Sequence, residues 1–161
     1  MMWEFLIVLI LVAAVATIIN GVEECNRKET MSFREAMDLT NLPIVTFYQG
    51  DKKFNFLLDT GSSLSVINQS TLESITHTAS DNTGSLFGVD GVKREVSYVS
   101  IDLSYKNNNY TEEFQVLDMQ NAIDQVKTES GVNMIGIIGS EFFRKYRYIL
   151  DFNELVAYSK K

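Results

Sequence analysis

Short runs of alternating apolar and polar residues, separated by turn residues, cover most of the chain after residue 42. A side-chain period of two is typical of β-strands, and Gly, Asn and Asp favour the turns between them. The pattern predicts an all-β domain over residues 42–161. Strands are expected at residues 43–48, 53–58, 63–67, 95–103, 110–117, 134–139, 148–152 and 155–158.

Helical patterns are short and few. Ser32 and Glu35 have capping-box spacing ahead of an apolar stripe, which predicts a helix that ends before Pro43. Residues 119–131 predict a second short helix that ends at a glycine, and residues 140–146 a helical turn. The polar residues 76–82 are expected to form a loop.

The first 22 residues differ from the rest, because residues 5–19 contain no charged side chain. Counted from Trp3 to Val22, the apolar segment is just long enough for a transmembrane helix. Residues 1–22 are therefore predicted to anchor the chain, and residues 3–20 to contact the lipid bilayer. A cleaved signal peptide is the main alternative, but the leader lacks the usual Lys or Arg. A buried soluble helix is a further alternative, although no polar face interrupts the run.

Residues 23–41 then form a juxtamembrane tether that includes the short helix. Arg27, Lys28 and Arg34 follow the apolar segment, whereas no Lys or Arg precedes it. By the positive-inside rule, this distribution favours a single-pass protein whose C-terminal domain faces the cytoplasm.

The composition narrows the range of chemistry. The formal net charge of −7 argues against nucleic acid as a partner. The chain has one cysteine and one histidine, so the sequence predicts no intrachain disulfide and no zinc site. No cofactor or metal is expected.

The candidate catalytic residue is Asp59. The apolar run at residues 54–58 leads into the loop Thr60-Gly61-Ser62, and a second apolar run follows. Gly61 has no side chain, so a peptide backbone can approach the carboxylate closely. The hydroxyl groups of Thr60 and Ser62 can hydrogen-bond the loop or the carboxylate itself.

Asp59-Thr60-Gly61-Ser62 resembles the active-site signature of aspartic proteases. A glycine-containing hairpin at residues 87–91, an apolar strand at residues 137–139 and a last pair of strands follow the signature. This order is that of the single-lobe, retropepsin-like branch of the family, and the resemblance covers residues 42–159. It implies an acid-protease β-barrel with short helices; the transmembrane helix predicted from the apolar run would precede this barrel. It also implies a flap hairpin at Phe87, Gly88, Val89, Asp90 and Gly91, and a strand behind the catalytic loop at Ile137, Ile138 and Gly139.

The chemistry of this family needs two carboxylates that share one proton. The chain has a single Asp-(Thr/Ser)-Gly, so the resemblance implies a homodimer in which Asp59 of each copy meets at a two-fold axis and activates a water. Thr60 would brace the loop across the axis, and Ser62 would hydrogen-bond its own Asp59. The substrate would be an extended polypeptide.

Two other functions fit the same residues. A non-catalytic module could bind a peptide or partner on a retropepsin-like fold, since fold does not determine function. A membrane-tethered structural β domain with an accidental Asp-Thr-Gly is the third. Among these, a membrane-anchored aspartic endopeptidase accounts for most of the motifs.

Overall fold

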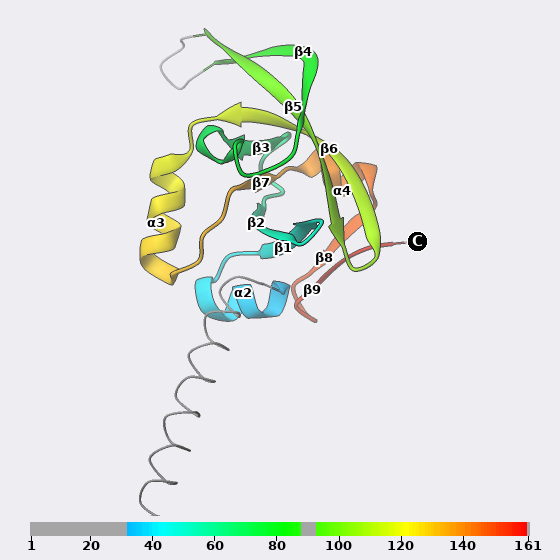
Figure 1. Cartoon of the computed structure of the whole chain (residues 1–161). Helices are drawn as coiled ribbons and strands as arrows, with labels where there is room; N and C mark the ends of the chain where they lie inside the picture. Colours follow the sequence, from blue (N-terminus) through cyan, green and yellow to red (C-terminus); the bar gives the residue numbers. More distant parts are fainter. Residues whose placement is uncertain (1–31, 88–92, 161) are drawn as a thin grey trace, which may run out of the picture.

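A seven-stranded sheet forms the body of the molecule, in the strand order β1-β2-β7-β3-β6-β5-β4 (Figure 1). The structure, a computed structural model, describes residues 32–87 and 93–160. The strands are β1 Ile44–Gln49, β2 Lys52–Leu58, β3 Ser65–Asn68, β4 Thr78–Phe87, β5 Lys93–Tyr105, β6 Asn108–Leu117 and β7 Gly136–Ile138. The prediction of a β-fold built from short strands is confirmed.

The sheet closes into a barrel because β1 pairs with two neighbours. It runs antiparallel to β2 along its length and meets β5 at Tyr48 and Ser104. In the middle of the sheet, β7 lies between β2, to which it is parallel, and β3, to which it is antiparallel. Strand β7 therefore touches both strands that flank residues 59–64.

Aromatic side chains fill the barrel. Phe47 lies at the centre, and its ring centroid is 5.9 Å from Phe56, 5.9 Å from Tyr110 and 6.0 Å from Phe142. Phe114 also packs against Phe56, with ring centroids 5.5 Å apart. Each fully buried phenylalanine contributes about 1.5–3 kcal/mol to folding. The core thus joins β1, β2, β6 and the helix that carries Phe142.

The helices are α2 Phe33–Thr40, α3 Gln120–Ser130 and α4 Ser140–Lys145, with a 3₁₀ turn η1 at Gln69–Thr71. The predicted capping box is present: Ser32 and Glu35 each bind the backbone N–H of the other. Helix α3 ends at Gly131, which adopts the left-handed conformation typical of this position. The predicted helices after Ser32 and at residues 119–131 are confirmed, and so is the helical turn at residues 140–146.

The predicted membrane anchor, residues 1–22, lies outside the described residues. Within residues 32–87 and 93–160, no helix is long and apolar enough to cross a bilayer.

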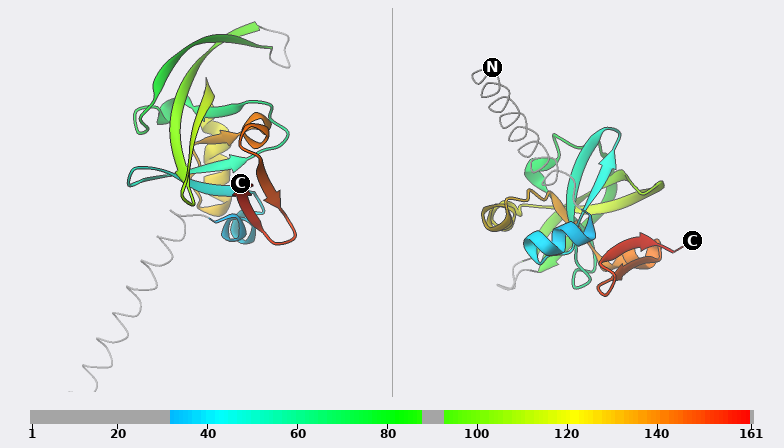
Figure 2. Two further views of the ribbon diagram at one scale, coloured as in Figure 1. Left: turned by 90° about the vertical axis from the view of Figure 1, so that its right-hand side faces the viewer. Right: turned by 90° about the horizontal axis from the view of Figure 1, so that it is seen from below.

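Strand β4 begins at Thr78, so the prediction of a loop at residues 76–82 is wrong for most of that segment. Polar residues form a strand here because β5 offers a long partner, with a register shift between Ala79 and Thr83. The two strands rise from the barrel as a curved pair of arms (Figures 1 and 2).

The chain ends in a separate hairpin of β8 Tyr148–Asp151 and β9 Val156–Ser159. Within the described residues, these two strands pair only with each other. The hairpin is attached to α2 by a ring contact of 5.2 Å between Phe152 and Phe33, and by a hydrogen bond from Arg34 to the carbonyl oxygen of Glu154. Phe152 nevertheless stays 57% exposed.

Candidate active site

Asp59 follows directly on the last residue of β2, at the start of the segment 59–64 that we call the Asp59 loop. Its backbone N–H donates a hydrogen bond to the carbonyl oxygen of Ile138, at 3.0 Å. Its side chain is half-buried, and Oδ1 accepts a hydrogen bond of 2.8 Å from the N–H of Gly61. The carboxylate is therefore oriented by the loop and still reaches the surface.

The three residues after Asp59 differ in what they contact. A Cβ atom at Gly61 would lie 3.2 Å from Asp59 Oδ1, so glycine keeps the space beside the carboxylate open. Thr60 is exposed, and its hydroxyl has no hydrogen-bond partner among the described residues. The hydroxyl of Ser62 donates to the carbonyl oxygen of Leu64 at 2.7 Å, rather than to Asp59 as the resemblance implied.

Strand β7 passes behind the Asp59 loop. Ile138 pairs with Leu58 on β2, and Ile137 pairs with Val66 on β3. A Cβ atom at Gly139 would overlap the backbone carbonyl group of Leu64, so a glycine is needed for this close approach. The structure thus brings residues 137–139, predicted as the packing strand, against the loop that carries Asp59.

The first turn of α4 fastens the loop from the same side. The N–H groups of Ser140 and Glu141 donate to the carbonyl oxygens of Ser62 and Ser63, at 2.7 Å and 3.1 Å. Helix N-termini have free N–H groups, and here they bind loop carbonyls instead of water. The loop is therefore held at its start by β7 and at its end by α4.

A buried glutamate, Glu112, lies close to the end of the Asp59 loop, and no sequence motif pointed to it. Glu112 on β6 is 5% exposed, and its Oε1 accepts a hydrogen bond of 2.8 Å from Ser65 Oγ. Its Oε2 lies 3.6 Å from Lys145 Nζ. Burial raises the pKa of Glu112 above 4.5, although Ser65 and Lys145 both favour the charged form. Residues 65 and 112 are too distant in sequence for periodicity to pair them.

Most of the predicted flap, residues 87–91, lies outside the described residues. Phe87 ends β4 and pairs with Lys93 on β5, while Gly88, Val89, Asp90 and Gly91 lie outside the described residues. Lower on the arms, a Cβ atom at Gly84 would overlap the ring of Tyr98, so the glycine makes room for that ring. The structure therefore shows two paired arms that lead to the predicted tip.

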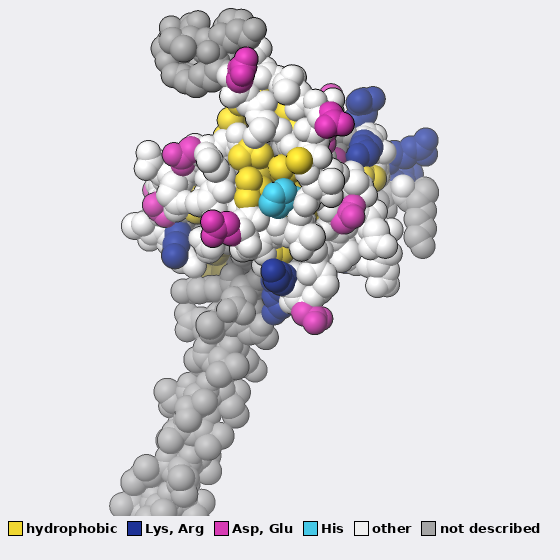
Figure 3. Space-filling model, turned by 45° about the horizontal axis from the view of Figure 1, so that its top comes forward, with side chains coloured by type: hydrophobic (Ala, Val, Ile, Leu, Met, Phe, Trp, Pro, Cys, Tyr) yellow, Lys and Arg dark blue, Asp and Glu magenta, His cyan; other side chains and the backbone are white. Residues whose placement is uncertain are grey.

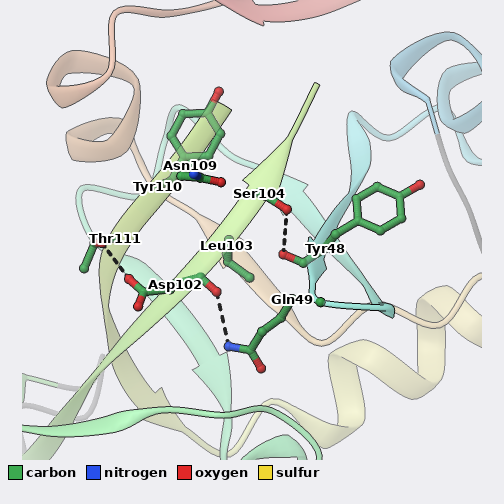
Figure 4. Close-up of a pocket in the computed structure, with 9 residues that line it drawn as sticks. Tyr48, Gln49, Asp102, Leu103, Ser104, Asn109, Tyr110 and Thr111 are labelled. Carbon is green, nitrogen blue, oxygen red and sulfur yellow. Dashed lines mark hydrogen bonds between the residues drawn. The ribbon is translucent and has the colours of Figure 1, made fainter. Parts of the chain in front are cut away.

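A pocket of about 360 Å³ lies at the opposite end of β2 from Asp59, between the β1–β2 turn and β5 (Figure 4). Gln49 closes it by donating to the carbonyl oxygen of Asp102 at 3.2 Å, and Asp102 accepts from Thr111 at 2.6 Å. None of the predicted site residues lines this pocket.

Surface charge is mixed in sign. On the face shown in Figure 3, acidic and basic side chains are interspersed around a central hydrophobic area. Among the residues that the structure describes, no group of three or more His, Cys, Asp or Glu side chains is placed to hold a metal ion.

The family model described as aspartyl protease matches residues 45–142, which is more than half of the chain. The chain belongs to the aspartyl protease family. The match includes Asp59 and its loop, the β4–β5 arms, β7 and the first residues of α4. No curated protein matches the sequence at a significant level.

Two solved structures are similar to this aspartyl protease family member. The retroviral protease-like domain of Ddi1 from Leishmania major is 15% identical, with a TM-score of 0.52 over 74% of this chain and 89% of that one. The EIAV protease complexed with the inhibitor HBY-793 is 18% identical, with a TM-score of 0.45 over 65% of this chain and 86% of that one. The first of these likenesses supports a retropepsin-like fold.

Proposed function

We propose that the chain is an aspartic endopeptidase that is active as a homodimer on extended polypeptides. The observation that carries the proposal is the setting of Asp59, a half-buried carboxylate held by the N–H of Gly61 and by a backbone bond to β7. Membership of the aspartyl protease family supports this assignment.

The dimer follows from the number of carboxylates. Peptide hydrolysis of this kind needs two acids that share a proton, and the sequence holds one Asp-Thr-Gly. A second copy, related by a two-fold axis, supplies the second Asp59. The exposed Thr60 hydroxyl, which has no partner among the described residues, is free to bind the other subunit near that axis.

In the dimer, the ionised Asp59 takes a proton from a water molecule, whose oxygen attacks the scissile carbonyl carbon. The protonated Asp59 of the other copy donates its proton to the carbonyl oxygen, giving a tetrahedral diol. Collapse of the diol breaks the C–N bond, and a proton passes to the departing nitrogen. The dyad returns to its singly protonated state.

The β8–β9 hairpin is the surface that we assign to the dimer. Its outer backbone groups are available for pairing, because the hairpin joins no other strand within the described residues. Phe152 and Tyr158, at 57% and 41% exposure, add apolar area to it. A second copy of the same hairpin could extend the sheet across a two-fold axis.

We also assign residues 3–20 to the bilayer and the protease domain to its cytoplasmic side. The uncharged run at residues 5–19 and the basic residues after it support this placement. Anchoring two copies in one membrane raises their effective concentration, so a small interface suffices. Deletion of residues 1–22 should move the protein from the membrane pellet to the supernatant after alkaline extraction.

The test of activity compares the full chain, in detergent, with its Asp59→Asn variant on a complex peptide mixture, and reads new termini by mass spectrometry. We expect cleavage by the wild type and none by Asp59→Asn, with equal thermal unfolding. Asp51→Asn is the matched control, because it makes the same change in an exposed turn that asparagine also favours. Equal cleavage by wild type and Asp59→Asn would remove the proposal.

A further inference from the structure

One peptide group, between Ile138 and Gly139, is held at both of its polar ends. Its carbonyl oxygen accepts the hydrogen bond of 3.0 Å from Asp59 N–H. Its N–H donates to Ser65 Oγ at 3.1 Å. The backbone of Asp59 is thus linked to the side chain of Ser65 through a single rigid unit.

The chain of hydrogen bonds continues to the buried acid. Ser65 uses its hydroxyl proton to donate to Glu112 Oε1 at 2.8 Å, and both side chains are buried. Every donor in the series from Asp59 to Ser65 points towards this carboxylate. Lys145, on α4, lies against the other oxygen, at 3.6 Å.

We propose that Glu112 is a positioning residue for Asp59, and that its ionised carboxylate fixes the backbone of the Asp59 loop through Ser65 and the Ile138–Gly139 peptide. This inference rests on the proposed protease function for its consequence in catalysis. The structural link itself does not depend on turnover.

The charge matters because it strengthens the bonds in series. A hydrogen bond to a carboxylate is roughly twice as strong as one between neutral groups. A serine that donates to a carboxylate is also a better acceptor for Gly139 N–H, and the polarised peptide is a better acceptor for Asp59 N–H. Protonation of Glu112 weakens the first bond and, through it, the others.

The surroundings of Glu112 determine when it carries that charge. Burial raises the pKa of Glu112, while the Ser65 hydroxyl and Lys145 lower it and the nearby charge of Glu141 raises it. A pocket of about 340 Å³ borders these groups, and the titratable or charged side chains that face it are Tyr98 from β5, Glu113 from β6, and Glu141, Arg144 and Lys145 from α4. The positioning bonds therefore weaken as the solution becomes acidic.

The test follows the backbone directly, by ¹H–¹⁵N NMR of the full chain in detergent. An Asp59→Asn background removes the carboxylate at residue 59, so that it does not contribute to the signals. We expect the amide signals of Gly139 and residue 59 to titrate together above pH 4.5, the ordinary value for a glutamate. Adding Glu112→Gln should abolish this titration, since the amide imitates the protonated acid. Adding Glu73→Gln, which changes an exposed side chain, should leave it in place.

Lys145→Met gives a second readout at a side chain that is 51% exposed. Loss of the cation should move the shared titration midpoint to higher pH, because the charged form of Glu112 loses a favourable partner. This variant keeps the test decisive if Glu112→Gln does not fold. Amide signals that do not titrate, or a midpoint that Lys145→Met leaves unchanged, would overturn the proposal.

The same variants connect the link to catalysis. In the active chain, Glu112→Gln should lower kcat about tenfold with KM nearly unchanged, since a small misplacement of a catalytic group slows the chemical step. It should also remove one ionisation from the acid side of the pH profile. If the wild type cleaves nothing, the proposed function fails, and the NMR titration still decides whether Glu112 governs the Asp59 backbone.

Discussion

The amide nitrogen of Asp59 lies 3.0 Å from the carbonyl oxygen of Ile138, 79 positions further along the chain. This bond continues the parallel pairing of β2 and β7 by one residue, at the point where β2 ends and the loop begins. The candidate catalytic aspartate is therefore the first residue after β2, and β7 still holds its backbone.

Gly139→Ala tests how closely the backbone after β7 packs against the Asp59 loop. The new methyl group would overlap the carbonyl group of Leu64, so the backbone must shift. We expect a loss of about 1–3 kcal/mol in unfolding free energy, measured by chemical denaturation. Ser140→Ala, one residue away, should change stability much less, because its hydroxyl makes only a long bond of 3.5 Å to Ser63. Equal stability of Gly139→Ala and wild type would show that the contact is not close.

Tyr158→Glu tests the assignment of the dimer surface. Two copies of the variant would bring like charges together at the β8–β9 hairpin, so the dimer dissociation constant should rise about tenfold or more. Sedimentation in detergent measures it. Leu39→Glu is the control, since Leu39 is similarly exposed, at 44%, but lies on α2. If both variants dimerise as the wild type does, the interface lies elsewhere.

Tyr148→Phe should stabilise the protein. The hydroxyl of Tyr148 is buried and has no hydrogen-bond partner among the described residues, and burial strongly raises its pKa. Removing an unpaired buried hydroxyl should increase the free energy of unfolding by about 1 kcal/mol. Tyr110→Phe should have the opposite effect, because Tyr110 forms a bond of 2.7 Å with Ser159. A lower melting temperature for Tyr148→Phe would contradict this account.

The sequence predicted the strands and turns well, because alternation and turn residues are local properties. It failed at residues 78–82, where the polar side chains give no strand pattern although β4 pairs with β5. It also gave Ser62 the wrong partner, since a resemblance carries over residue types and not the course of the loop. Glu112 was missed because its link to Ser65 spans 47 positions and follows no motif.

Glu112 should also affect stability as a function of pH. Its pKa is raised in the folded state by burial, so the folded protein holds this proton more tightly than the unfolded chain. The contribution of Glu112 to the free energy of unfolding is therefore fully present at pH values below 4.5. It is lost as the pH rises through the pKa of Glu112 in the folded state. Relative to Glu112→Gln, the wild type should lose unfolding free energy over that window, as denaturation at a series of pH values would show. If the wild type instead gained unfolding free energy relative to Glu112→Gln as the pH rose, this prediction would be contradicted.

The most direct test of the central claim mixes wild type with Asp59→Asn at constant total concentration and lets the subunits exchange. If each active site needs one Asp59 from each copy, activity should follow the square of the wild-type fraction and fall to about one quarter in an equal mixture. A linear decline, to about one half, would show that a single copy carries the whole catalytic centre and would contradict the shared dyad.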